Sequence, residues 1–428
     1  MAEIKPFRAF FYNQQEFKDP SLLFCPPYDV ISPQQQEYYH KISPYNFIHI
    51  LLRKDSPGEN RYITSGRAFK DWIKKGVLIQ EKSPAIYFHL QEYSIRGEKK
   101  IRLGFIALLR LSNKESSILG HENTHTKAKE DRGKLLSRTN ANLSPIFVVF
   151  KDKRRVVQRV FDQSIIGSLP LIDVTDPEKT RHKIWSIEDP KIIEFVQSGI
   201  REENLFIADG HHRYEVSCAY RDKMRLKLKD KFSESASFNY TLSYFTPADQ
   251  RGLSIMPIHR IVGLPKGVLL ESFLSSIKEN FDLEKVKERS RFFFLLEKGG
   301  SYGHIIGMYL DKGYFLLRLK NIKILDKEMP DKPKEYRLLD AAILNQLIFK
   351  RILGINPEDK EIIRYTANPK ECIEEVDSKI DKVAFFLNPV KMEDIMAVAL
   401  KDSKMPPKST YFYPKVLSGL LVHKHDNI

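Results

Sequence analysis

The sequence predicts an α+β fold with mixed or antiparallel sheets, divided between two domains. The chain has 428 residues, more than one ordinary hydrophobic core holds. Short apolar runs bounded by turn residues indicate strands, and longer stretches with apolar residues at helical spacing lie between them. Two strand-like runs, 85–95 and 101–111, are joined only by the turn sequence RGEKK, which is typical of an antiparallel hairpin.

The first 262 residues carry the other elements of the first predicted domain. Strands are expected at 5–12, 146–152, 183–189, 204–210, 237–247 and 253–262. Helices are expected shortly after the proline-rich stretch at 26–33, then within 59–76, at 127–139, at 190–199 and after Gly210. In the helix within 59–76, Phe69, Trp72 and Ile73 share one side, and Gly76 ends it.

Beyond residue 262 the pattern changes, so we predict a motif-bearing domain at 1–262 and a C-terminal α+β domain at 263–428. Helices are expected there at 268–281, 337–353 and 391–400, and strands at 291–298, 304–311, 314–320 and 382–388. The Pro-rich and polar stretches between these elements are expected to be loops.

Composition narrows the class of protein. No window reaches the apolar run of roughly 18 residues that a membrane helix needs, and the N-terminus lacks the apolar stretch of a signal peptide. The three cysteines, Cys25, Cys218 and Cys372, lie far apart, which favours a reducing compartment over a disulfide framework. We therefore expect a cytoplasmic protein without a membrane partner.

The formal net charge is +15, from 70 Lys and Arg against 55 Asp and Glu. Acidic residues are interleaved with the basic ones, as in KEDRGK and DKPKEYR, so a solvated lysine-rich surface accounts for the excess. Phosphorylated small molecules are compatible with this surface, and nucleic acid is compatible but not favoured.

The segment richest in chemistry is NLFIADGHHRYEVSCAYRD, residues 204–222. Gly210 permits a tight turn after the strand. The polar residues around it are Asp209 before the turn and His211, His212 and Arg213 in the first turn of the helix. Helix N-termini attract anions, and Arg and His add donors, so this turn predicts a phosphate or carboxylate site. The alternative is that Asp209 caps the helix and the histidines are ordinary surface groups.

Residues 121–125 form the string His-Glu-Asn-Thr-His, which matches the zinc-protease pattern H-E-x-x-H. That chemistry needs both histidines on one face of a helix, with a third ligand downstream. The stretch around Asn123 and Thr124 has low helix propensity, and the helical pattern begins only at Lys127. Zinc is therefore not expected here. It is not expected on the adjacent pair His211 and His212 either, because neighbouring residues point in different directions.

The polar loop that remains suits acid–base and phosphate chemistry. His121 or Glu122 could take a proton from a substrate hydroxyl, while Lys127 and Arg132 could bind phosphate. A salt-bridged surface loop is the alternative. Downstream, Asn142 could orient substrate or cap the turn before the next strand.

A third candidate element is CPPYDVIS, residues 25–32. The two prolines fix an extended backbone, after which Tyr28 could contact a base or substrate and Asp29 could act as a base or bind magnesium. The alternative is a rigid turn in which Ser32 caps the next helix. The pair His259 and Arg260 is a weaker candidate for the same pocket or for the domain boundary.

Several ordered motifs, FIADGHHRYE, PPYDVIS, HENT…KEDR and ANLSPIF, resemble a widespread bacterial family catalogued as a domain of unknown function. That family is similar, more loosely, to the ParB/sulfiredoxin-like superfamily, which includes free-serine kinases and binds nucleotides through a strand–turn–helix motif. The resemblance implies that Gly210, His211 and Arg213 hold nucleotide phosphates and that Asp209 positions a reacting group or a metal.

These features lead to three functional hypotheses. The first is a nucleotide-dependent phosphotransferase, a serine-kinase-like small-molecule kinase using Mg²⁺ with ATP or ADP, with Glu122, His121, Asp209 and Asp29 as candidate catalytic residues. The second is a non-catalytic nucleotide- or DNA-binding regulator of the ParB type. The third is a His-dependent hydrolase or metalloenzyme. The expected partners are a nucleotide and a small-molecule substrate, and the sequence leaves the oligomeric state open.

Overall fold

The computed structural model describes residues 1–112, 117–265, 267, 269–357, 359, 362–379 and 381–426. They form two compact units. The first unit comprises the described residues of Met1–Gly120, Thr124–Ser254 and Pro414–Ile428, and the second comprises His121–Asn123 and Ile255–Tyr413. The boundary near residue 262 stays a prediction. This grouping differs from it in three ways: the second unit starts at Ile255, it includes His121–Asn123, and the described residues from Pro414 onward belong to the first unit.

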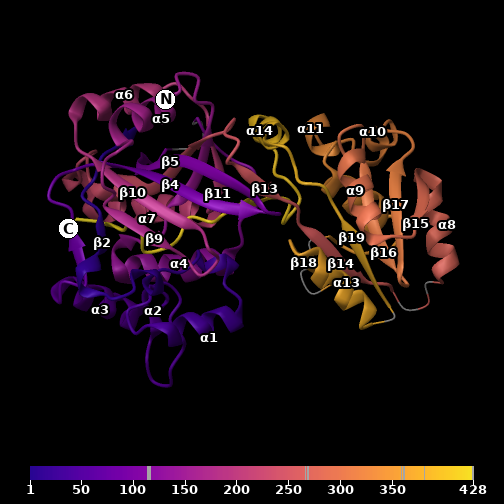
Figure 1. Cartoon of the computed structure of the whole chain (residues 1–428), viewed down its shortest axis with the longest axis horizontal. Helices are drawn as coiled ribbons and strands as arrows, with labels where there is room; N and C mark the ends of the chain where they lie inside the picture. The colour runs from indigo at the N-terminus through magenta and orange to yellow at the C-terminus, as the bar shows by residue number, and fades with distance from the viewer. Residues whose placement is uncertain are drawn as a thin grey trace. The chain divides into compact units, whose positions relative to one another are not determined.

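The first unit is built around a mixed sheet, visible in Figure 1. Within the described residues it has nine strands, in the order β6-β11-β8-β12-β5-β4-β10-β9, with β1 also paired to β5. The strands are β1 (Ile4–Lys5), β4 (Ile86–Ile95), β5 (Glu98–Arg110), β6 (Ile118–Gly120), β8 (Ile146–Phe150), β9 (Ile172–Thr175), β10 (Arg181–Ile187), β11 (Leu205–Asp209) and β12 (Tyr240–Pro247). The pairs β11–β6 and β12–β8 are parallel, and the other described pairs are antiparallel.

One face of this sheet carries the hydrophobic core. Alternate residues of β4 and β5, such as Phe88 and Phe105, are buried there against α5 (Val156–Val160) and α6 (Pro190–Ile200). Helix α6 starts where Asp189 accepts a hydrogen bond from the Lys191 N–H and a proline occupies its first turn, both of which favour a helix N-terminus. In Figure 1 both helices lie above the sheet.

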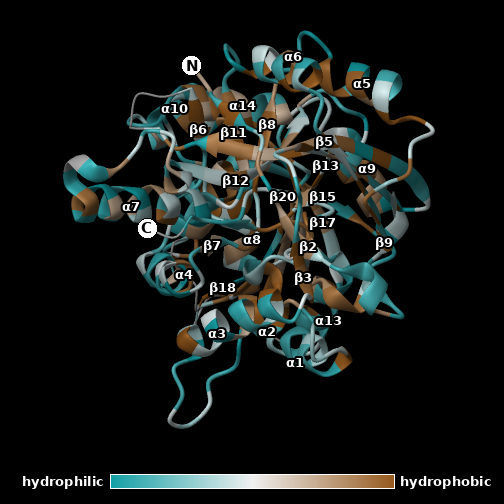
Figure 2. Ribbon diagram, turned by 90° about the vertical axis from the view of Figure 1, so that its left-hand side faces the viewer, coloured by the Kyte–Doolittle hydropathy of each residue, from teal (hydrophilic) through white to brown (hydrophobic). Residues whose placement is uncertain are grey.

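Helices α1 (Pro33–Ile42), α2 (Ile48–Leu51), α3 (Arg61–Lys74) and α4 (Thr126–Thr139) lie below the sheet in Figure 1. Helix α4 packs against α3 and against α7 (His211–Leu228). Phe69 and Trp72 of α3 are buried, as the sequence pattern predicts. In Figure 2 the hydrophobic colour lies along β8 and β11, whereas α4 and α7 are largely hydrophilic in colour.

The last described residues of the chain return to the first unit. Strand β21 (His423–Lys424) pairs with β7 (Ala141–Asn142), and isolated bridges join Val422 to Phe10 and Ser418 to Cys25. The hydroxyls of Ser418 and Ser144 are 2.6 Å apart. The C-terminal segment is therefore part of the packing of the first unit.

The second unit is an antiparallel sheet with helices on both faces. Its described strands follow the order β15-β17-β16-β19-β14-β18. They are β14 (His259–Gly263), β15 (Phe281–Val286), β16 (Ile305–Leu310), β17 (Gly313–Leu319), β18 (Ile363–Thr366) and β19 (Lys382–Phe386). Helices α9 (Arg289–Gly299) and α13 (Pro369–Asp377) share a core with one face. On the other face, Phe349, from the π-helix Leu344–Lys350 that follows α12 (Asp340–Ile343), contacts Phe385 of β19.

The α+β class with mixed and antiparallel sheets is confirmed, and so is the hairpin of β4 and β5. The strand predicted at 291–298 is wrong, because these residues belong to helix α9. Phe292 and Leu296, four residues apart, are buried, while Phe294 between them is 62% exposed, which is the spacing of a helix rather than a strand. The strand predicted at 5–12 is interrupted at Pro6, which has no N–H for a ladder, and resumes as β2 (Phe10–Tyr12).

Helices α8 (Leu270–Asn280) and α14 (Met392–Leu400) form within the stretches predicted as helical, although residue 268 of the first prediction lies outside the described residues. Among the described residues, no helix combines the length and apolar character needed to cross a membrane.

Candidate functional site

The turn between β11 and α7 depends on Gly210. Its φ of +86° lies in the left-handed region, where a side chain would be strained. A Cβ at this position would also lie 2.9 Å from the guanidinium of Arg213. Gly210 is itself the N-cap of α7 and contributes no side-chain cap. The sequence predicts that Gly210 permits the tight turn, and its positive φ agrees with this. The absence of a side chain also lets Arg213 fold back over the turn.

Asp209 does not cap α7; its carboxylate binds two cations instead. It accepts hydrogen bonds from the ammonium of Lys415 at 2.9 Å and from Nη2 of Arg213 at 2.6 Å. Burial acts to raise the pKa of Asp209, but the charges of Lys415 and Arg213 outweigh burial and hold the pKa well below its usual value. The carboxyl is therefore ionised, and the three groups together carry one excess positive charge.

The side chain of Arg213 is 11% exposed, and its guanidinium pairs with the carboxylate of Asp209. It also donates to the backbone carbonyl of Pro145, while its Nε has no hydrogen-bond partner among the described residues. Arg213 forms part of the wall of a pocket of about 50 Å³ in the first unit.

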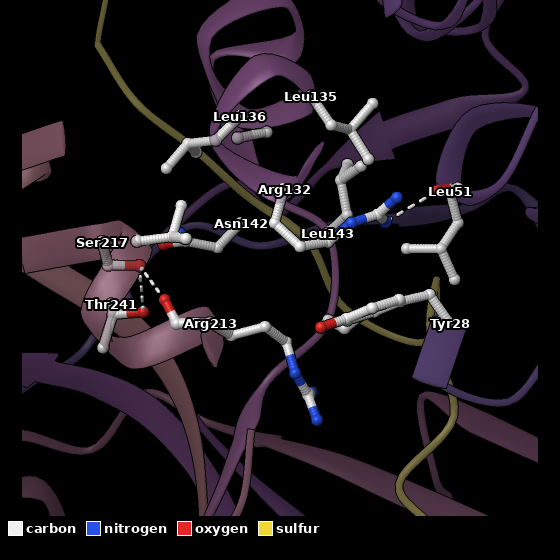
Figure 3. Close-up of a pocket in the computed structure, with 13 residues that line it drawn as sticks. Tyr28, Leu51, Arg132, Leu135, Leu136, Asn142, Leu143, Arg213, Ser217 and Thr241 are labelled. Atoms are coloured by element: carbon white, nitrogen blue, oxygen red, sulfur yellow. Dashed lines mark hydrogen bonds between the residues drawn. The ribbon is translucent and has the colours of Figure 1, made fainter. Parts of the chain in front are cut away.

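Four residues that the sequence singled out line this pocket together: Tyr28, Arg132, Asn142 and Arg213. Figure 3 shows the Tyr28 hydroxyl pointing into the space between the side chains of Arg132 and Arg213. Apolar side chains complete the wall, among them Leu51, Leu135, Leu136 and Leu143. Ser217 and Thr241, which are hydrogen-bonded at 3.2 Å, close another side.

Arg132 is held in place by contacts on three sides. Its guanidinium lies 4.2 Å from the ring centre of Tyr28, donates to the Leu51 carbonyl at 2.9 Å and donates to the carboxylate of Asp131. Asp131 also accepts from Arg61 and Tyr62. Although burial acts to raise the pKa of Asp131, the neighbouring Arg132, the bond from Tyr62 and the charge of Arg61 lower it.

Tyr28 offers a hydroxyl donor to the pocket. Burial, with a contribution from the charge of Asp29, raises the pKa of Tyr28 to about 12. The phenol therefore stays protonated at neutral pH and can donate a hydrogen bond to an anion. Asp29 itself is exposed on the short 3₁₀ helix Tyr28–Val30, and Ser32 caps α1 through a capping box.

The lining suits an anionic group. Among the described lining residues there are two arginines and no carboxylate, so the donor set does not fit a Mg²⁺ ion, which prefers carboxylate and other oxygen ligands. A volume of about 50 Å³ holds a few water molecules. A group of that size, such as one phosphate or carboxylate, fits better than a complete nucleotide, whose remainder would extend beyond the pocket.

The other predicted residues of the first unit lie around the turn or away from it. His211 is buried at the first turn of α7, and the charge of its imidazole contributes to lowering the pKa of Asp209. His212 accepts a hydrogen bond at Nε2 from the His125 N–H at 2.9 Å. Lys127 is exposed on α4.

His121 and Glu122 belong to the second unit. The hydroxyl of Thr410 lies 3.3 Å from Nε2 of His121 and 3.4 Å from a carboxylate oxygen of Glu122. That these two residues share a site with Asp209 and Arg213 stays a prediction.

The string His-Glu-Asn-Thr-His does not have the geometry of a zinc protease. Helix α4 begins at Thr126, with His125 as its N-cap, so both histidines precede the helix instead of sharing a helical face. Within the part of the chain that the structure describes, no group of three or more His, Cys, Asp or Glu side chains is arranged to hold a metal ion.

Lys415 is the residue of this region that sequence reasoning missed. It lies 206 positions from Asp209 in the chain, within an unremarkable stretch, FYPKVLSG. The sequence offers one indirect signal. Asp209 ends a strand of buried residues, and a buried carboxylate needs a cationic partner. Which of the 70 lysines and arginines supplies it is decided by the fold.

Comparison with known proteins places the chain in a family. Residues 4–342 match the family model described as "Protein of unknown function (DUF1015)", so the chain belongs to that family, as its motifs predict. No curated protein gives a significant match.

The matching solved structures are distant. They include SbnI with a C-terminal truncation from Staphylococcus aureus, at 13% identity and a TM-score of 0.37, covering 73% of this chain and 85% of that one. A free serine kinase variant in complex with ADP matches at 14% identity and a TM-score of 0.31, covering 69% and 84%. A conserved hypothetical protein from Pyrococcus furiosus matches at 11% identity and a TM-score of 0.32, covering 73% and 91%. At these TM-scores the likeness carries no argument about the chemistry of this chain.

Proposed function

We propose that this member of the DUF1015 family is a nucleotide-dependent phosphotransferase that holds a nucleotide phosphate in the pocket of Tyr28, Arg132 and Arg213. The observation that carries the proposal is the lining itself, which combines two guanidinium groups and a protonated phenol with no carboxylate among its described residues. Arginine suits phosphate oxygens because its N–H groups form a fork. The choice of a nucleotide rests on the resemblance of the Asp209–Arg213 string to a nucleotide-binding turn.

Two further features support phosphate over a neutral ligand. The group of Asp209, Arg213 and Lys415 retains one excess positive charge. Helix α7 spans 18 residues and begins at this turn without a side-chain cap, so the positive end of its dipole adds to the attraction for an anion.

In the proposed reaction, a hydroxyl oxygen of a small metabolite forms a bond to the terminal phosphorus of the nucleotide. The bond from that phosphorus to the bridging oxygen breaks, and the shortened nucleotide leaves with the electron pair. The hydroxyl proton passes to a carboxylate, for which Asp29 and Glu122 are the candidates. Any Mg²⁺ would enter with the nucleotide phosphates, because the described lining supplies no carboxylate for it.

Calorimetry with ATP, ADP, CTP and GTP, each with Mg²⁺, tests the binding step. We expect at least one nucleotide to bind, and Arg213→Lys to weaken it at least tenfold, because lysine keeps the charge beside Asp209 but loses the fork. Arg201→Lys, on an exposed arginine outside the pocket lining, is the matched control. If the folded protein binds none of the four nucleotides, the proposal is wrong.

Turnover separates catalysis from binding. With ATP and a panel of small hydroxylated metabolites including serine, we expect a phosphorylated product, and we expect either Asp29→Asn or Glu122→Gln to abolish it while nucleotide binding persists. Nucleotide binding without turnover of any metabolite would instead support the non-catalytic regulator.

A further inference from the structure

A second cavity, of about 290 Å³, lies wholly within the second unit. It forms at one end of the antiparallel sheet, where the loop after β19 meets the loops that precede β14 and β16. The neighbouring strands run in opposite directions, so the end of β19 and the starts of the other two lie at the same edge. The residues before α12 and α14 complete the wall.

One wall of this cavity carries a buried arginine. Arg260 is 1% exposed, and it stands directly opposite Phe385 in the register of β14 and β19. It therefore points to the face covered by the helix after α12 rather than to the core face of its neighbour Ile261. Its guanidinium donates to the carbonyls of Ile258 at 2.6 Å and Lys408 at 3.3 Å.

Arg260 has no carboxylate partner among the described residues. Its Nε has no hydrogen-bond partner there, and the centre of the Tyr365 ring lies 5.6 Å from the guanidinium carbon. Burial lowers the pKa of Arg260 to about 10, so it remains charged at neutral pH. A buried cation without an anion is costly, and a bound anion would remove that cost.

The cavity wall also carries two carboxylates, those of Asp340 and Asp394. Asp340 holds Nδ1 of His304 at 2.8 Å, and Asp394 lies in the first turn of α14 beside Lys391. The formal charges of Asp340 and Asp394 equal in number those of Arg260 and Lys391, although no described carboxylate pairs with Arg260. The cavity therefore presents both signs with no net charge, which disfavours a multiply charged phosphate and a bare metal cation alike.

We propose that this cavity binds a small zwitterion, with its carboxylate on Arg260 and its ammonium group at the carboxylate of Asp394. Asp394 is exposed at the surface. Desolvation, together with the charges of Glu393 and Asp340, raises its pKa, and a bound ammonium group would relieve this. The site is independent of the phosphate pocket, because each of its lining residues belongs to the second unit.

Ligand-observed saturation-transfer NMR on the full chain tests the proposal. Glycine, β-alanine and γ-aminobutyrate vary the separation of the two charges, while propionate and propylamine each carry one charge alone. We expect at least one zwitterion to bind at least tenfold more tightly than both single-charge probes. Equal binding of propionate would contradict the role of Asp394, and binding of none of the five probes would overturn the proposal.

Two variants locate the site. Asp394→Asn is expected to weaken the best zwitterion at least fivefold and to leave propionate unchanged, with Asp402→Asn, an exposed carboxylate of the same unit outside the lining, as the matched control. Arg260→Met is expected to abolish binding of the zwitterion. If circular dichroism shows that Arg260→Met is unfolded, the Asp394→Asn result decides, and an unchanged affinity in that variant refutes the site.

Discussion

Each unit has an arginine in the wall of a pocket, and the two arginines differ in their partners. In the first unit Arg213 shares the buried carboxylate of Asp209 with Lys415. In the second unit Arg260 is more deeply buried, and its contacts among the described residues are two carbonyl oxygens and an aromatic ring. The first arginine is thus held in an ion pair with a carboxylate, whereas the second has no carboxylate partner among the described residues.

Because their partners differ, the two arginines should contribute differently to the stability of the fold. Removing one partner of a buried ion pair leaves the other charge exposed to a low dielectric, so it destabilises strongly. Replacing a buried charge that has no partner by an apolar side chain removes a cost instead. The same substitution at the two positions should therefore have opposite consequences.

The largest effect is expected from Arg213→Met. The substitution leaves Asp209 with Lys415 alone and takes a donor from the Pro145 carbonyl. We expect the free energy of unfolding to fall by about 3 kcal/mol, measured by urea denaturation at pH 7. Arg201→Met, on an exposed arginine, should stay within about 0.5 kcal/mol of the parent, and a similarly small loss at Arg213 would break the comparison.

Similar in size is the effect expected at Asp209, the partner of both cations. Its pKa is lowered in the folded state, so its stabilising contribution is present above the unfolded value of about 4 and is lost as the pH falls through the lower folded value. We expect Asp209→Asn to lose about 3 kcal/mol at pH 7, because it leaves Arg213 and Lys415 without a carboxylate. The variant should also show a shallower decline in unfolding free energy below pH 4. An unchanged slope would mean that Asp209 does not hold its charge in the folded protein.

Arg260→Met should behave differently from Arg213→Met. We expect the free energy of unfolding at pH 7 to stay within about 1 kcal/mol of the parent or to rise, because the lost bonds to Ile258 and Lys408 are offset by removal of an unpartnered charge. A loss as large as that of Arg213→Met would show that the charge of Arg260 is compensated after all.

The smallest effect is expected from Lys127→Ala. Lys127 is exposed on α4 and lies outside the described lining of the pocket, so stability should change by less than about 0.5 kcal/mol. Nucleotide affinity should change less than threefold. A loss as large as that of Arg213→Lys would support the role in phosphate binding that the sequence predicts for Lys127, and would move the ligand away from Tyr28.

Local sequence features predicted much of the fold and part of the candidate site. Short-range rules on turns and helix propensity predict three features: the turn at Gly210, the start of α4 after the His-Glu-Asn-Thr-His string, and the hairpin of β4 and β5. The strand assigned to 291–298 failed because a continuous run of apolar residues does not distinguish a strand from a half-buried helix.

The partners of the site residues could not be predicted, because they come from distant parts of the chain. Tyr28 and Arg132 contact each other from separate elements of the chain, and Lys415 reaches Asp209 from 206 positions away in the sequence. The sequence marks Arg260 and His259 as candidates, but no neighbouring residue in the sequence indicates that Arg260 is buried or that it has no carboxylate partner among the described residues.

The return of the C-terminal segment to the first unit sets an order of events on the ribosome. Asp209 is synthesised 206 residues before Lys415, and at roughly 5–20 residues per second this gap lasts on the order of 10–40 s. In that interval the continuous stretch Ile255–Tyr413 is synthesised, while β7 still lacks β21. The unit whose synthesis begins first is therefore completed last, once Lys415 is available to pair with Asp209.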